Sequence, residues 1–433
     1  MLISGLIIST IATTNSYADL PKPYLNTCLE LEGLEKSGQK LSDSQKNFTN
    51  ICGNVVRIPD NQDDNAVAAL RHEELAAQGS VSLESSTKHT NSVTQRINTL
   101  HQTNKGGGSG DGLLDSSRWG FFANIGYNEG DRTKTVNVSG AGQLGDAKKA
   151  TVQGERAFDF DGKELAIGID YRFPGEKLIV GSSLGYTKLD SQFAANAGST
   201  KLNGQHLSVY TTYLPSDKLY IDGIVSIGKN AIDGSRLVPV YDKKTNTVLA
   251  TDGRAFSNTD SKQVSASIGM GYAFNRNAWN ISPYSRLDYT KTKIDAYTET
   301  VLDNDPLGRS SSGMILSVHE QNITSLIGVI GIRTSYPMSA SGGVFIPQAS
   351  LELNRQFKND AREIEASLPV AEELKADNPK AETSKLDRNY LKLGLGVSAV
   401  FPKGHSGFIQ LESLQGSRDF SDTAIKAGYR LEF

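Results

Sequence analysis

Residues 422–433 read D-T-A-I-K-A-G-Y-R-L-E-F, and apolar side chains alternate with polar or small ones along this stretch. Successive side chains of a β-strand point to opposite faces, so the stretch predicts a strand with one apolar and one polar face. The apolar face, which ends on an aromatic residue, consists of Ile425, Ala427, Tyr429, Leu431 and Phe433. The polar face carries Lys426, Arg430 and Glu432.

The same period of two recurs through the preceding three hundred or so residues. Between 119 and 127, for example, Trp119, Phe121 and Ile125 alternate with residues that, except for Phe122, are small or polar, which predicts a half-apolar strand. In 321–336 apolar residues fall on both faces, so that strand is less clearly patterned. With the last strand, twelve are expected: 119–127, 165–173, 178–186, 207–213, 219–227, 264–274, 279–289, 321–336, 345–353, 391–401, 409–411 and 425–433.

The connections between these strands alternate in length. Five are tight turns, at Pro174, Pro215, 275–277, 337–338 and 402–404. The others are polar and mostly longer: 131–157, 190–203, 231–257, 300–312, 356–388 and a short last one at 416–421. Short turns on one rim and long loops on the other are typical of a transmembrane β-barrel, whereas a soluble sandwich does not sort its loops in this way.

Aromatic residues gather at the short-turn ends of the predicted strands, as in the interfacial girdle of a membrane barrel. They are Tyr171, Phe173, Tyr213, Tyr272, Phe274, Trp279, Tyr336 and Phe401. Beyond the N-terminal segment there is no apolar run of eighteen residues, so no transmembrane helix is expected. The predicted fold is mainly β: a 12-stranded antiparallel transmembrane β-barrel at 118–433, with a small α-helical N-terminal domain.

The first eighteen residues have the pattern of a secretory signal peptide. An apolar run at 2–12 is followed by the small-x-small site Ser16-Tyr17-Ala18, although no Lys or Arg precedes the run. The alternative is a short buried strand or helix. Export would place Cys28 and Cys52 in an oxidising compartment, so we expect them to form a disulfide.

Two helical regions are expected between the signal peptide and the barrel. In 19–62, apolar residues at helical spacing predict two short helices stapled by the disulfide, and Ser42-x-x-Gln45 has the spacing of a capping box. In 63–117, a favourable helix around 66–77 and a sparse apolar stripe, Val93, Ile97 and Leu100, precede a glycine-rich linker at 106–112.

Neither composition nor motifs point to catalysis. The 45 basic and 48 acidic residues give a net charge of −3, without the concentrated basic surface that nucleic-acid binding requires. The six histidines are scattered without metal-ligand spacing, and His72-Glu73-Glu74 lacks a second His. We therefore expect no catalytic residues, no metal and no cofactor.

The polar faces of the predicted strands carry charges of both signs into the barrel lumen. Asp288 or Glu352 would pair with a lumenal helix or form a selectivity ring; alternatively, the charges are simply a solvated pore wall. The lumenal set is Glu164, Asp170, Arg172, Asp222, Arg286, Asp288, Glu352, Lys392, Glu412, Lys426 and Arg430.

This order of segments resembles the autotransporter (type Va secretion) family, whose C-terminal domain is a twelve-stranded translocator barrel. The motifs that carry the resemblance are I-S-P-Y-S-R-L-D-Y at 281–289 with I-D-A-Y-T-E at 294–299, A-G-Y-R-L-E-F at 427–433, and A-A-L-R-H-E-E-L-A-A within 66–77. The resemblance covers 118–433. The chain departs from typical members in its passenger, the exported segment that precedes the barrel. This segment has only about a hundred residues and no β-helix repeats.

The resemblance implies a monomeric barrel in the outer membrane of a Gram-negative bacterium, with outer-membrane lipid around it. It also implies recognition of the C-terminal strand by the barrel-assembly machinery, and a helix near Val93–Leu100 that threads the lumen. The alternative for this helix is a periplasmic plug that never enters the pore. Asn91-Ser92, Asn98-Thr99 and Asn104-Lys105 do not match the family's cleavage pairs, so we predict no self-cleavage. Two other functions remain open: a porin-like channel with a periplasmic N-terminal domain, and an adhesin acting through its loops.

Overall fold

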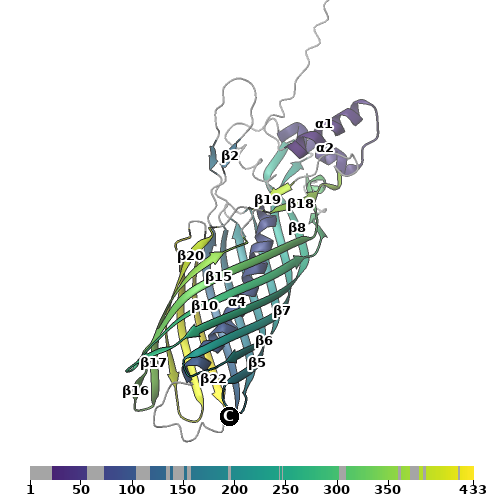
Figure 1. The fold of residues 1–433 in the computed structure, drawn as a ribbon. Coiled ribbons are helices and arrows are strands. Elements are labelled where there is room, and N and C mark those ends of the chain that lie inside the picture. Colours follow the sequence, from purple (N-terminus) through teal and green to yellow (C-terminus); the bar gives the residue numbers. More distant parts are fainter. Residues whose placement is uncertain are drawn as a thin grey trace, which may run out of the picture.

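A closed barrel with a helix inside it dominates the computed structural model (Figure 1). The structure describes residues 22–55, 73–103, 118–132, 137–139, 151–153, 158–193, 197–242, 244–245, 247–301, 309–358, 362–370, 380–383, 387–417 and 420–433. The predicted signal peptide at 1–18 and the glycine-rich linker lie outside the described residues. No helix of the described part is both long and apolar enough to cross a membrane.

Twelve long antiparallel strands form the barrel wall, each paired with the next in sequence. The last strand pairs with the first, with Leu431 opposite Phe121, and this pairing removes both sheet edges. The strands are β1 (Trp119–Arg132), β4 (Phe158–Arg172), β5 (Leu178–Phe193), β6 (Gly198–Tyr213), β7 (Leu219–Asp242), β8 (Thr247–Tyr272), β10 (Trp279–Ile294), β15 (Gln321–Ser335), β17 (Gly343–Gln356), β20 (Asn389–Val400), β21 (His405–Gln415) and β22 (Phe420–Glu432).

The outer face of the wall is apolar and the inner face is polar or small. Ile125, Ile268 and Leu395 are each about 60% exposed, while their sequence neighbours Asn124 and Ser267 are buried inside the barrel. So much exposed apolar surface is stable only in lipid, which confirms the predicted transmembrane barrel.

Shorter elements lie at the two rims of the barrel. They are β2 (Asn137–Ser139), β3 (Thr151–Gln153), β9 (Phe274–Arg276), β11 (Tyr297–Thr298), β12 (Thr300–Val301), β13 (Arg309–Ser310), the 3-10 helix η3 (Ser312–Met314), β14 (Ser317–Val318), β16 (Met338–Ala340), β18 (Glu363–Ser367) and β19 (Lys380–Glu382). Except for β9 and β16, all belong to the long connections, so these connections are partly ordered rather than plain loops.

Two of the predicted loops are wrong. The segment 190–203 is mostly strand, because β5 continues to Phe193 and β6 begins at Gly198. The segment 231–257 belongs almost entirely to β7 and β8, which project beyond the rest of the barrel (Figure 1). On these extensions the outward face is polar, as at Asp233 and Ser235, while Ile232 and Val238 are buried on the inward face. The alternation of apolar outside and polar inside that revealed the strands is therefore lost there, although the pairing continues.

One predicted turn is also misplaced. The chain between β15 and β17 turns at Ser341 and Gly342 instead of 337–338, because residues 338–340 form β16 and pair with the start of β17. Proline interrupts a strand, but at the rim of a barrel it does not have to end the hairpin.

Three helices precede the barrel: α1 (Lys22–Lys36), α2 (Asp43–Val55) and α4 (Glu73–Thr103). The predicted capping box is present at α2, where the Ser42 amide donates to Gln45 Oε1 at 2.8 Å and the Gln45 amide donates to Ser42 Oγ at 3.2 Å. Helices α1 and α2 lie at the long-loop rim, opposite the end where the chain terminates, and α4 runs down the lumen (Figure 1).

Candidate functional site

The lumen is the candidate functional site, because α4 meets the barrel wall along its whole length. Its 31 residues correspond to about 46 Å of α-helix, more than the roughly 30 Å thickness of a bilayer's hydrocarbon core. Near its start, Gln78 donates to Ser257 and accepts from Tyr297 at the long-loop rim. Near its end, His101 lies 3.0 Å from Asp222 by the short-turn rim. The helix is therefore much longer than the predicted lumenal segment around 93–100.

The strongest polar contact of α4 is with β4. Arg96 donates from Nε and Nη2 to the two carboxylate oxygens of Asp170, at 2.6 Å each. Tyr210 donates its hydroxyl to the same carboxylate at 2.7 Å, and the guanidinium lies 5.5 Å from the ring centre of Phe122. Both members of the ion pair are almost fully buried, and a buried charge of this kind is costly unless its partner is present.

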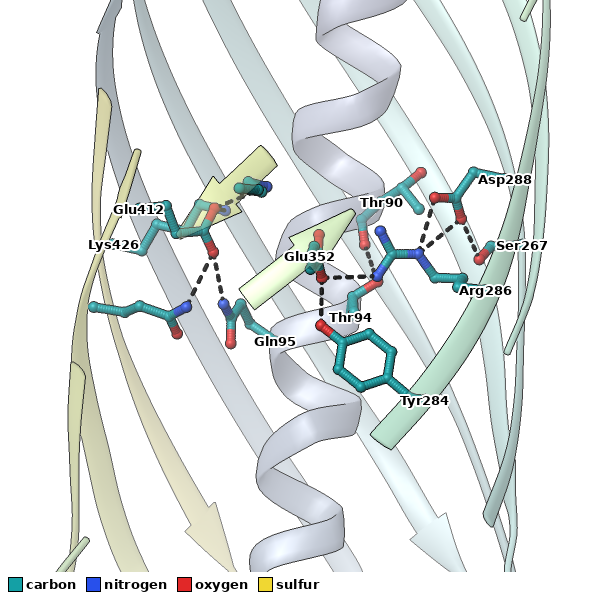
Figure 2. A network of polar contacts seen from close by, with 12 residues as sticks. Thr90, Thr94, Gln95, Ser267, Tyr284, Arg286, Asp288, Glu352, Glu412 and Lys426 are labelled. Carbon is teal, nitrogen blue, oxygen red and sulfur yellow. Dashed lines mark hydrogen bonds and ion pairs between the residues drawn. The ribbon is translucent and has the colours of Figure 1, made fainter. Parts of the chain in front are cut away.

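A second cluster anchors the other side of the helix to the last strands (Figure 2). Gln95 donates to Glu412 at 3.0 Å. The Glu412 carboxylate also forms ion pairs with the ammonium groups of Lys392, at 2.9 Å, and Lys426, at 3.0 Å. Two cations thus neutralise the carboxylate that accepts the hydrogen bond from the helix. These three residues lie on β20, β21 and β22, the last strands of the wall, whereas Asp170 lies on β4, near the start of the wall. The helix therefore links the first strands of the wall to the last.

A third cluster belongs to the wall. Arg286 lies 2.9 Å from Asp288 and 3.6 Å from Glu352, which also accepts a hydrogen bond from Tyr284 at 2.6 Å. Figure 2 shows this group beside Thr94 of α4. It borders a cavity of about 30 Å³, enough for a few water molecules.

Histidines form a fourth contact between helix and wall. The rings of His89 on α4 and His206 on β6 stack with centroids 4.9 Å apart. His89 also bonds to Ser208 at 2.6 Å, and Ser85 bonds to His206 at 3.0 Å. No group of three His, Cys, Asp or Glu side chains in the described part of the chain is arranged to hold a metal ion.

Glycines on the inner face of the wall make room for these helix side chains. A Cβ at Gly185 would lie 2.1 Å from the His89 ring, and one at Gly120 would lie 2.5 Å from Arg96. Similarly, a Cβ at Gly204 would lie 2.6 Å from Ser85. The wall is thus shaped to the helix at several points, with the close packing of a protein interior.

The long-loop rim holds α1 and α2 through a shared apolar core. Phe48 and Ile51 of α2 are buried together with Met314, Leu316 and Ile364 of the barrel's loops. Cys28 and Cys52 form a disulfide between the two helices. Residues 22–55, called the N-terminal unit below, therefore complete a core that about forty residues cannot build alone.

A buried ion pair supports this core from the wall side. Arg236 on the extension of β7 donates to both carboxylate oxygens of Glu299 at 2.7 Å, and it also donates to the Met314 carbonyl at 2.7 Å. The Leu316 amide donates to the same carboxylate. Nearby, burial raises the pKa of the Tyr297 hydroxyl above its ordinary value, and the charge of Glu299 adds to the shift.

The predicted lumenal charges divide among these clusters. Asp170 and Asp222 contact α4, whereas Asp288 and Glu352, the two acids singled out as partners for a lumenal helix, pair with Arg286. Lys392 joins Glu412. Arg172 is two residues from Asp170 on β4, and Arg430 lies beside Glu432 at the closing strand.

Sequence reasoning missed the helix side of the site. Arg96, Gln95 and His89 were not singled out, because the sparse apolar stripe of the helix predicts its core-facing side but not which of its polar side chains reach a partner on the wall. A usable signal was present in the wall, where inward strand positions such as Gly185 and Gly204 are glycine instead of a lumenal side chain.

Comparisons with known proteins agree with this architecture. The family model described as autotransporter beta-domain matches residues 136–412. Outer membrane protein A of Rickettsia conorii is 23% identical over 440 residues, a match that covers 97% of the chain and 19% of that protein. The pertactin autotransporter of Bordetella bronchiseptica is 23% identical over 308 residues, covering 70% of the chain and 30% of that protein. The chain thus spans less than a third of the length of these relatives.

A solved structure shares the fold. The translocator domain of the autotransporter NalP from Neisseria meningitidis matches with a TM-score of 0.54 and 16% identity, covering 81% of this chain and 98% of that one. More than half of the chain matches the family model. The chain therefore belongs to the autotransporter beta-domain family, and its barrel is an outer-membrane barrel of a Gram-negative bacterium.

Proposed function

We propose that this barrel brings its N-terminal unit across the outer membrane and keeps it docked on the outward rim as a lid, with α4 as the tether through the pore. The proposal involves no chemical step. Membrane barrels place long loops outside the cell and short turns in the periplasm. The N-terminal unit contacts the long-loop rim, so it would lie outside.

One observation carries the proposal: the core shared by the N-terminal unit and the loops. Phe48 and Leu31 are fully buried, and they belong to the same cluster as Leu316 and Val318. A Cβ at Gly313 would lie 2.8 Å from the backbone of Ser44, so η3 and α2 are in close contact. A passenger destined for release has no need of a core that its own barrel completes.

The two alternative functions receive less support. A porin-like channel with a periplasmic N-terminal domain needs that domain at the short-turn rim, yet the start of α4 meets Ser257 and Tyr297 at the long-loop rim. In the described lumen, α4 fills the space beside the wall, and this favours a closed pore. An adhesin acting through its loops is compatible with the lid, because the lid and the loops lie at the same rim of the barrel.

The experiment loosens the lid without touching the lumen. Arg236→Met leaves the Glu299 carboxylate buried without its cation, and Arg236→Met with Glu299→Leu replaces the pair by apolar groups. On intact cells we expect added protease to remove the N-terminal unit faster from the single variant, and the double variant to recover most of the resistance. Both barrels should remain heat-modifiable. Equal protease resistance of the single variant and the wild type would contradict the lid.

A further inference from the structure

On five strands, the apolar outward face of the barrel ends in a lysine on the side of the long-loop rim. On each of five strands, a lysine stands two residues beyond an outward apolar side chain: Lys163 after Leu165, and Lys188 after Tyr186, for example. Because side chains alternate along a strand, this spacing keeps the lysines on the lipid side. We call the following residues the lysine band: Lys163 (β4), Lys188 (β5), Lys229 (β7), Lys262 (β8), and Lys291 and Lys293 (β10).

Strand register brings these lysines together. Lys163 is directly opposite Lys188, and Lys262 is directly opposite both Lys229 and Lys293 on its two neighbouring strands. Like charges directly opposite each other on adjacent strands repel and destabilise the sheet. Such an arrangement is stabilised when an anion lies between the ammonium groups.

Acidic side chains of the protein neutralise only part of the band. Lys188 lies 3.4 Å from Asp190, Lys229 lies 3.0 Å from Asp260, and Lys293 lies 2.6 Å from Glu320. Asp190 and Asp260 lie two residues farther from the apolar belt than Lys188 and Lys229. The ammonium groups are therefore closer than the carboxylates to the acyl chains of the surrounding lipid. Within the described residues, no ion pair involves the three exposed lysines that remain: Lys163, Lys262 and Lys291.

The opposite rim has a different chemistry. There the outward positions at the ends of β4 and β8 are aromatic, Tyr171 with Phe173 and Tyr272 with Phe274, and they form the interfacial girdle. The lysine band is thus confined to one leaflet. On β1, which neighbours β4, the corresponding outward positions are acidic, Glu129 and Asp131.

We propose that the lysine band binds the phosphate groups of acylated lipids in the outer leaflet, with the acyl chains lying on the apolar side chains below it. Lysine stems lie along apolar surface while their ammonium groups reach the headgroup level. At the headgroup level, each lysine of a basic cluster raises the affinity for an anionic lipid by about fivefold. The assignment to the outer leaflet rests on the proposed function, which orients the barrel. The binding of lipid phosphate groups by the lysine band does not depend on that orientation.

The test uses the full chain folded in detergent micelles and titrated with a bis-phosphorylated, acylated disaccharide. Its dephosphorylated form is the lipid control. The variant is Lys163→Gln with Lys262→Gln and Lys291→Gln. The protein control removes three cations from the opposite rim: Lys177→Gln, Lys218→Gln and Arg276→Gln. Binding is followed by native mass spectrometry, and heat-modifiability verifies that each barrel is folded.

We expect the phosphorylated lipid to bind the lysine-band variant about a hundredfold more weakly, and the opposite-rim variant to bind it like the wild type. The dephosphorylated lipid should bind the wild type as weakly as the phosphorylated lipid binds the lysine-band variant. Equal affinity of the lysine-band variant and the wild type would overturn the proposal. So would equal affinity for the dephosphorylated lipid, or displacement of the lipid by inorganic phosphate at comparable concentration, which would identify free phosphate as the ligand.

Discussion

Arg96 of the lumenal helix and Asp170 of the barrel wall form a two-pronged ion pair, with both nitrogen to oxygen distances at 2.6 Å and both side chains buried. This pair links the N-terminal segment of the chain to the wall that surrounds it. It is therefore the place where the account of a permanently seated helix can be tested by stability.

Removing one partner should destabilise the folded barrel markedly. We expect Arg96→Met to lower the free energy of unfolding by about 3–5 kcal/mol, because Asp170 would stay buried without its cation. Arg96→Met with Asp170→Leu should recover most of that loss. Equilibrium unfolding in detergent measures both. Asp170→Leu alone completes the cycle. If the losses of the two single variants summed to the loss of the double variant, the pair would not couple helix to wall.

The glycine opposite His89 gives a steric test. We expect Gly185→Ala to destabilise the seated helix by about 1–3 kcal/mol, because the new Cβ would lie 2.1 Å from the His89 ring. The ring cannot swing away freely, since it stacks on His206 and bonds to Ser208. His89→Ala in the same chain removes the clash, so the double variant should unfold at a higher temperature than Gly185→Ala alone. An unchanged unfolding temperature for Gly185→Ala would show that the helix is loosely held.

The disulfide should matter for the N-terminal unit and little for the barrel. Cys28 and Cys52 are 24 residues apart in sequence, and closing such a loop contributes about 3 kcal/mol. We expect Cys28→Ser with Cys52→Ser to make the N-terminal unit protease-sensitive on intact cells. Heat-modifiability of the barrel should stay normal. A loss of folded barrel in this variant would mean that the unit is needed for barrel assembly.

The closing strand tests the assembly role expected of the C-terminus. The Trp119 amide donates to the Phe433 carbonyl at 3.2 Å, and the Phe433 amide donates to the Trp119 carbonyl at 3.0 Å. We expect Tyr429→Asp, which places a charge on the lipid face, to reduce the amount of folded barrel in the outer membrane several-fold. Thr423→Asp, near the polar rim of the same strand, is the control. Normal levels of heat-modifiable Tyr429→Asp barrel would refute the role.

The wall of this protein was largely predictable from sequence, because lipid imposes a period of two on most of its strands. The terminal alternation through Tyr429 and Leu431 and the order of short and long connections were sufficient for the strand number. The extensions of β7 and β8 were not predictable in the same way. On the extensions the outward face is solvated, as at Asp233 and Ser235, and the inward face buries Ile232 and Val238, which is the reverse of the pattern in the membrane-spanning part.

The site was only half visible in the sequence. Asp170 and Asp222 follow from strand alternation, but their partners Arg96 and His101 lie on a polar helix whose register against the wall depends on three-dimensional fit. The docking of the N-terminal unit was invisible for a related reason. Its core is shared with loops far away in sequence, Met314 and Ile364 among them, and no local pattern encodes such a contact.

The central claim is that the N-terminal unit sits outside the cell, tethered by the helix through the pore. Labelling of intact cells with a membrane-impermeant amine reagent tests it most directly. Lys36 and Lys46 are exposed on the N-terminal unit, whereas Lys177 and Lys218 are exposed at the short-turn rim. We predict that mass spectrometry finds Lys36 and Lys46 modified on intact cells, and Lys177 and Lys218 modified only after the outer membrane is permeabilised. The reverse pattern would contradict the account.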